Sequence, residues 1–254
     1  IQQVRPYSKK LQEVLSNIVS GSDGEMGMTL ATERPIENVL LIVITSDRGL
    51  CGAYNANIIK LAKLAIVEKY AAQASRGNVE IWTIGKKGYE HFIKNKFKVD
   101  ARFKDIFLNL NFENVQAASQ SAVKAFEAKQ FDRVELVYSE FRNAATQTFV
   151  LERFLPIPRV LPKDGAKKSD FIFEPSQEKL VAELMPKILN TQLYKAVLDA
   201  NASEHGARMT AMDKATENAN ELLKSLKISY NRARQAAITT ELTEIVSGAA
   251  ALQV

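Results

Sequence analysis

The chain has 254 residues, of which 46% are hydrophobic and 25% are charged; these proportions are ordinary for a globular protein and exclude a disordered or collagen-like chain. The single cysteine, Cys51, excludes an intrachain disulfide, and no run of 18 apolar residues predicts a transmembrane helix. The net charge of +5 permits acidic partners, but the basic blocks and aromatic–basic motifs of nucleic-acid-binding proteins are missing from the sequence.

The first 20 residues predict a helix with one apolar face. Its apolar side chains recur at alternating intervals of three and four residues, as in a coiled-coil seam: Val4, Tyr7, Leu11, Val14 and Ile18. Residues 21–37 follow, and their glycine-rich, polar composition predicts a linker.

Residues 38–175 alternate short apolar runs with amphipathic stretches. The first run, residues 39–44, is rich in β-branched side chains and predicts a strand that is covered on both faces. Further strands are expected at residues 79–84, 99–107, 132–141 and 146–155, and helices at residues 55–74, 86–94 and 115–128. This order predicts a layered α/β domain with a mainly parallel sheet, whose last two strands form an antiparallel pair at one edge.

Residues 176–254 predict one very long helix. From Lys187 to Ser247 there is no proline and one glycine, Gly206, so an uninterrupted helix there would be about 90 Å long. Its apolar seam follows alternating steps of four and three residues: Leu198, Ala202, His205, Met209, Met212, Thr216, Ala219, Leu223, Leu226, Tyr230, Ala233 and Ala237. This heptad pattern predicts a left-handed coiled coil, and its many small residues require a closely packed partner helix.

The seam changes its register after Tyr230. A second stripe begins with four-residue steps and places Arg234 on or beside the seam: Arg234, Ile238, Leu242, Ile245, Ala249 and Leu252. Such a stutter predicts a local unwinding of the supercoil. The opening helix, about 30 Å long, can cover only about a third of this seam. The rest therefore needs a longer N-terminal helix, another protein, or both.

Catalytic motifs are not recognisable in the sequence. The loop at residues 49–52 follows the first strand but lacks a dinucleotide fingerprint and a Gly-Lys-Ser/Thr phosphate loop, so we expect a tight turn. Cys51 has no predicted histidine neighbour, because His91 and His205 belong to remote segments. His205 lies on the seam without a second ligand at metal-binding spacing. We therefore expect no catalytic residue, no cofactor and no metal.

Three interpretations remain from these patterns. The chain is a non-catalytic mechanical subunit of a complex, a nucleotide-binding α/β enzyme with a helical oligomerisation arm, or an interaction protein whose coiled coil homodimerises. The alanine-rich seam favours a close-packed antiparallel partner within one molecule over a bulky, self-complementary dimer seam.

Four motifs carry a resemblance to a known family. They are Thr45–Gly52 with Asn55, Ala207–Asp213, Tyr230–Ala236 and Glu241–Leu252. In this order they resemble the gamma subunit of F-type ATP synthase, and the resemblance covers the whole chain. Members of that family open with a long basic helix, and this sequence resembles them only from near the end of that helix. The resemblance therefore implies a truncated N-terminal helix.

The resemblance implies a Rossmann-like layered domain with long N- and C-terminal helices that form an antiparallel coiled coil. It also implies a central rotor shaft, which couples ion-driven rotation of a c-ring to ATP synthesis or hydrolysis at beta-subunit sites and is not itself an enzyme. The implied partners are the hexamer of alpha and beta subunits, the epsilon subunit and the membrane c-ring. The implied location is the cytoplasmic face of a bacterial plasma membrane, in preference to a mitochondrial or plastid membrane.

The resemblance further implies a set of contacts to the beta subunit. Arg234 and Gln235 match an arginine and a glutamine that bond to an acidic loop of one beta subunit. Charge-assisted hydrogen bonds of this kind contribute roughly 1.5–3 kcal/mol each. Thr239 and Glu241 match other positions in the same contact, and Arg232 is an expected electrostatic neighbour. On an anonymous helix these side chains would be interpreted as a solvated face.

Overall fold

The computed structural model describes residues 6–7, 10–11, 28–144, 146–157 and 177–252. The chain divides into two units, residues 1–209 and residues 210–254. Of the predicted opening helix, only residues 6–7 and 10–11 are described, and they are helical. The remainder of that helix and residues 158–176 lie outside the described residues, so the coiled coil with the opening helix stays a prediction.

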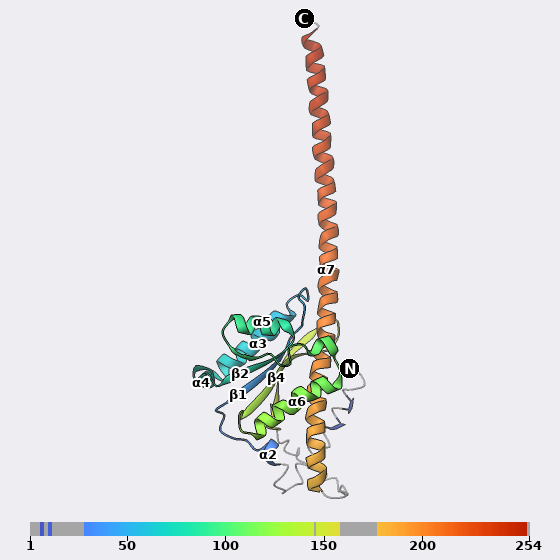
Figure 1. Ribbon diagram of the computed structural model, residues 1–254. Helices are drawn as coiled ribbons and strands as arrows, with labels where there is room; N and C mark the ends of the chain where they lie inside the picture. The colour runs from blue at the N-terminus through green and yellow to red at the C-terminus, as the bar shows by residue number, and fades with distance from the viewer. Residues whose placement is uncertain (1–5, 8–9, 12–27, 145, 158–176, 253–254) are drawn as a thin grey trace, which may run out of the picture. The chain divides into compact units, whose positions relative to one another are not determined.

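A five-stranded sheet forms the centre of the first unit (Figure 1). Its spatial order is β3 (Lys98–Asp100), β2 (Val79–Ile84), β1 (Val39–Ile44), β4 (Arg133–Phe141) and β5 (Gln147–Leu155). β1 pairs in parallel with both β2 and β4, β3 is parallel to β2, and β5 is antiparallel to β4. The predicted mainly parallel sheet with an antiparallel pair at one edge is therefore confirmed.

Helices cover both faces of this sheet (Figure 1). The side chains of β1 alternate between the two faces, and all of them are buried. Leu40, Ile42 and Ile44 pack with α6 (Phe112–Glu127) and the first part of α7 (Gln177–Ala251). Leu41 and Val43 pack in a second core with three helices, α3 (Tyr54–Glu68), α4 (Ala71–Ser75) and α5 (Lys86–Lys94). The layered α/β prediction is thus confirmed.

The strand expected at residues 99–107 is mostly wrong. β3 has three residues, and a 3-10 helix, η1 (Ile106–Asn109), follows it. The Asp100 carboxylate accepts hydrogen bonds from the backbone N–H of Arg102 at 2.8 Å and from its Nε at 2.7 Å. This local turn ends the strand, because an aspartate that bonds to the backbone two residues later competes with the sheet ladder.

Residues 28–37, placed in the linker by their composition, are held against the α/β domain. They include a short helix, α2 (Met28–Ala31), whose Leu30 and Ala31 are buried. The Leu30 carbonyl accepts a hydrogen bond from the Ile157 N–H at 2.9 Å. The Arg34 guanidinium donates to the carbonyls of Phe126 and Phe131 at 3.1 and 3.0 Å. These contacts tie this segment to the end of α6.

The predicted long C-terminal helix is present as α7, which has 75 residues. Within the first unit, one side of α7 packs into the same core as α6, and this side includes Leu193, Ala196, Val197 and Ala200. The seam residues Leu198, Ala202 and His205 are half-buried or exposed. Successive residues of a helix are about 100° apart, which places the seam on the side opposite the buried one. The sheet therefore leaves the seam open to another partner.

Gly85, between β2 and α5, lies very close to the backbone of Thr45, the residue after β1. It has φ +100, and a Cβ added there would collide with the backbone carbonyl of Thr45. Gly77 has a similar φ, +75, but open space around it. We expect Gly85→Ala to lower the free energy of unfolding by about 2–3 kcal/mol and Gly77→Ala by only about 1 kcal/mol.

Urea unfolding followed by the fluorescence of Trp82 measures both variants, because Trp82 is the only tryptophan and is buried in this domain. Equal losses of stability in the two variants would contradict the conclusion that the nearby Thr45 carbonyl requires glycine at position 85.

Candidate functional site

The residues predicted to contact a beta subunit lie on α7 within the second unit. All are exposed: Arg232, Arg234, Gln235, Thr239 and Glu241. At about 100° per residue they fall within one half of the helix circumference. Arg232 and Glu241 lie about 180° apart at the two edges of this half, and the other three lie between them, over about two and a half turns.

Apolar side chains lie among these polar ones. Ile238, Leu242 and Ile245 are 47%, 57% and 67% exposed, and by helical geometry they run between Glu241 and Thr239. Burying an aliphatic side chain of this size stabilises a complex by about 1.5–3 kcal/mol. The surface is therefore suited to a partner that supplies both apolar contact and hydrogen-bond acceptors.

Some polar side chains of this surface form hydrogen bonds within α7, whereas its arginines remain available to a partner. The Thr239 hydroxyl donates to the Gln235 carbonyl at 2.9 Å, and those of Thr243 and Ser247 donate to carbonyls one turn earlier at 2.8 and 2.7 Å. Within the part of the chain that the structure describes, Arg232 and Arg234 form no ion pair. Their guanidinium donors can therefore bind a carboxylate of another chain.

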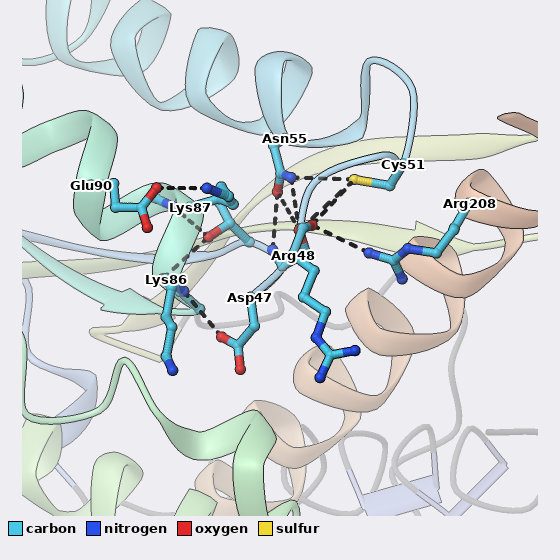
Figure 2. Close-up of polar contacts among 12 residues, drawn as sticks. Asp47, Arg48, Cys51, Asn55, Lys86, Lys87, Glu90 and Arg208 are labelled. Atoms are coloured by element: carbon cyan, nitrogen blue, oxygen red, sulfur yellow. Dashed lines mark hydrogen bonds and ion pairs between the residues drawn. The ribbon is translucent and has the colours of Figure 1, made fainter. Parts of the chain in front are cut away.

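A second polar cluster occupies the loop after β1, the Thr45–Gly52 motif (Figure 2). The Ser46 N–H donates to Asn55 Oδ1 at 3.0 Å, and Asn55 Nδ2 donates to Ser46 Oγ at 2.7 Å. Leu50 and Gly52 adopt positive φ values of 64° and 58°. The predicted tight turn is confirmed, and Asn55 holds it against the first turn of α3.

The side chain of Arg208 joins this loop to α7 (Figure 2). One guanidinium nitrogen pairs with Glu204 Oε1 at 2.7 Å, and another donates to the carbonyls of Arg48 and Gly49, each at 3.2 Å. The Asp47 carboxylate accepts from the Lys86 N–H at 3.1 Å, which adds α5 to the cluster. Sequence reasoning missed this role of Arg208, although it singled out the motif that contains it.

Near this loop, a buried tyrosine at the start of α3 also bonds to α7. The Tyr54 hydroxyl donates to the Ala200 carbonyl on α7 at 2.8 Å. Burial raises the pKa of Tyr54 well above its ordinary value, and the nearby Glu204 and Cys51 raise it further. The phenol therefore stays protonated and keeps its donor. Cys51 is buried and accepts a contact from Asn55 Nδ2 at 3.2 Å, which gives this thiol a packing role.

Two features of the described residues bear on other functions. No group of three or more His, Cys, Asp or Glu side chains among them is placed to hold a metal ion. No helix among them is long and apolar enough to cross a bilayer.

Comparisons with known proteins agree with each other. A family model described as ATP synthase matches residues 1–252. The ATP synthase gamma chain of Cytophaga hutchinsonii is 49% identical over 252 residues, which are 98% of this chain and 85% of the relative. The gamma chain of Flavobacterium johnsoniae is 48% identical over 98% of this chain and 85% of the relative, and that of Chlorobaculum tepidum is 46% identical over 99% and 86%.

Solved structures show the same fold at low sequence identity. A chain of the Euglena gracilis mitochondrial ATP synthase, OSCP/F1/c-ring, matches with a TM-score of 0.61 and 18% identity, over 99% of this chain and 91% of that one. A chain of the Tetrahymena thermophila mitochondrial ATP synthase central stalk and c-ring matches with a TM-score of 0.53 and 20% identity, over 85% and 98%.

We expect Arg208→Ala to loosen the loop at residues 48–52. Loss of its bonds to Arg48 and Gly49 should remove roughly 1.5 kcal/mol of local stability. Amide hydrogen exchange in the loop should accelerate about tenfold, as measured by mass spectrometry. Arg208→Lys should restore little, since one ammonium cannot reproduce the guanidinium fork. Lys214→Ala, on an exposed part of α7, is the control; equal loop exchange in Arg208→Ala and the control would reject the role.

Proposed function

The chain belongs to the family of ATP synthase gamma chains, and we propose that it serves as the central rotor shaft of that enzyme. In this role it couples the ion-driven rotation of a c-ring to ATP synthesis or hydrolysis at beta-subunit sites, and it has no catalytic site of its own. The observation that carries the proposal is the long, continuous α7, whose C-terminal part exposes apolar and charged side chains together.

The distribution of apolar residues on the second unit supports a helix enclosed by partners. Leu222, Leu223 and Ile228 are 60%, 51% and 48% exposed. By helical geometry they point in three directions that are each about 100° or more apart. A single partner helix covers one stripe, so it would leave others in water. A ring of surrounding subunits covers all of them.

The α/β domain and the long helix would have different roles in this shaft. Residues 38–175 are assigned to the domain that would stand near the c-ring and the epsilon subunit, with residues 21–37 as its N-terminal connection. Residues 176–254, paired with residues 1–20, would form the shaft, of which residues 210–254, the second unit, would lie inside the hexamer of alpha and beta subunits. The bacterial origin of the gamma chains described above supports a position at the cytoplasmic face of a bacterial plasma membrane.

The contact with a beta subunit is assigned to the five exposed residues on α7. Arg234 and Gln235 supply donors for carboxylates of an acidic loop, with Thr239, Glu241 and Arg232 as neighbours. Each charge-assisted bond contributes roughly 1.5–3 kcal/mol, which is enough to favour one rotational position and small enough to be broken at each step.

Arg234→Ala and Gln235→Ala should each lower ATP hydrolysis by the assembled enzyme, by roughly tenfold for a loss near 1.4 kcal/mol in the rate-limiting step. The helix itself should remain folded, because both side chains are exposed and alanine favours helix. Thr240→Ala, on another side of α7 and about one and a half turns further along, is the matched control. Steady-state turnover and circular dichroism measure the two effects; full turnover in both variants would reject the assigned contact.

The isolated chain should hydrolyse no ATP. This follows from its assignment as a non-catalytic subunit. Phosphate release by the purified chain should match that of buffer alone. Hydrolysis that survives purification and responds to mutation of the chain would instead favour the enzyme interpretation.

A further inference from the structure

The groove between α3 and α5 is unused by the rotor contacts described above. Its volume is about 580 Å³. It belongs to the face of the sheet covered by α3, α4 and α5, whereas the first part of α7 packs on the other face. Figure 2 shows Asn55, Lys87 and Glu90, which line one end of it.

Positive charge gathers in the α3–α5 groove. α3 contributes Lys60 and Lys63, one turn apart, and α5 contributes Lys87, His91 and Lys94 at intervals of four and three residues. Glu90 is the only acidic residue of the lining, and it pairs with Lys87 at 2.7 Å. Among the described residues, Lys60, Lys63 and Lys94 have no ion-pair partner. Three cations therefore share a small concave surface without neutralisation.

His91, which also lines the groove, has a lowered pKa. Partial burial lowers the pKa of His91, and the nearby Lys63 and Lys94 lower it further. Such a like-charge arrangement costs free energy in the free protein. An anionic group in the groove would relieve that cost.

The groove also has an apolar component. Ala56 and Ile59 lie in its lining between the lysines. Val67 is 69% exposed and by helical geometry continues the side of α3 that carries Ala56 and Lys63. A free phosphate would satisfy the lysines alone, whereas an apolar floor with cationic rims matches a peptide surface that combines both chemistries.

We propose that the α3–α5 groove docks an acidic segment of a partner protein, in which an apolar side chain is flanked by aspartate or glutamate. The apolar side chain lies against Ala56 and Ile59, and the carboxylates pair with Lys60, Lys63 and Lys94. Docking of this kind would attach a second protein to the face of the α/β domain opposite the first part of α7, Met185–Ala200.

A direct test uses the full chain and a fluorescein-labelled peptide of Glu-Leu-Glu repeats, with binding followed by fluorescence anisotropy. The wild-type chain should bind, and Lys60→Glu with Lys63→Glu should weaken binding at least about tenfold. Lys224→Glu with Lys227→Glu is the matched control, because these lysines have the same spacing on exposed α7. It should change the dissociation constant by less than about twofold. No binding by the wild-type chain, or equal losses in the two double variants, would overturn the proposal.

Ala56→Trp separates docking in the groove from attraction by net charge. Ala56 is exposed, so the variant should fold normally, as thermal melting by circular dichroism can show. Filling the floor should abolish peptide binding although every charge is retained. Unchanged binding would overturn the groove as the site. Stronger, lysine-dependent binding to phosphatidylglycerol vesicles than to the peptide would replace a protein partner with a membrane surface.

Discussion

The burial of one side of α7 against the sheet is the interaction on which the rest of the structure depends. Leu193, Val197 and Ala200 are completely buried there, and Ala196 is 1% exposed. Small residues let the helix lie close to the strands, and this close approach lets Tyr54 reach the Ala200 carbonyl and Arg208 reach the loop after β1. The opposite side of the same helix keeps its apolar seam available. One helix can therefore belong to a folded domain and still offer a surface to other chains.

The sheet could be predicted from the sequence because its signals are local. The run at residues 39–44 is apolar throughout, and a strand that is buried on both faces requires this. The end of β3 could not be predicted in the same way. Val99 to Phe107 has strand-like composition, but the bonds from Arg102 to Asp100 turn the chain after three residues. A short-range polar interaction thus overrides a general propensity.

The side of α7 that packs on the sheet could not be predicted from the sequence, for a different reason. It begins with large side chains, Met185, Ile188, Leu189 and Leu193, but continues with Ala196, Ala200 and the buried polar residues Asp199 and Ser203, which carry no apolar signal in the sequence. The Leu and Met residues of the seam give a stronger pattern on the opposite side. Arg208 was missed because its partners in the loop after β1 are backbone carbonyls, which the identity of a residue does not reveal. The beta-subunit contacts rested on family resemblance, since periodicity alone would assign Arg234 and Gln235 to solvent.

The hydroxyl groups near the end of α7 have a mechanical consequence. Thr239, Thr243 and Ser247 already donate to carbonyls of their own helix. A partner surface that moved past them would therefore have no hydrogen bond to these donors to break. With the contacts proposed for Arg232 and Arg234, resistance to rotation would be concentrated at their guanidinium groups, so that charge would set the angles at which the helix pauses and the movement between them would be nearly smooth.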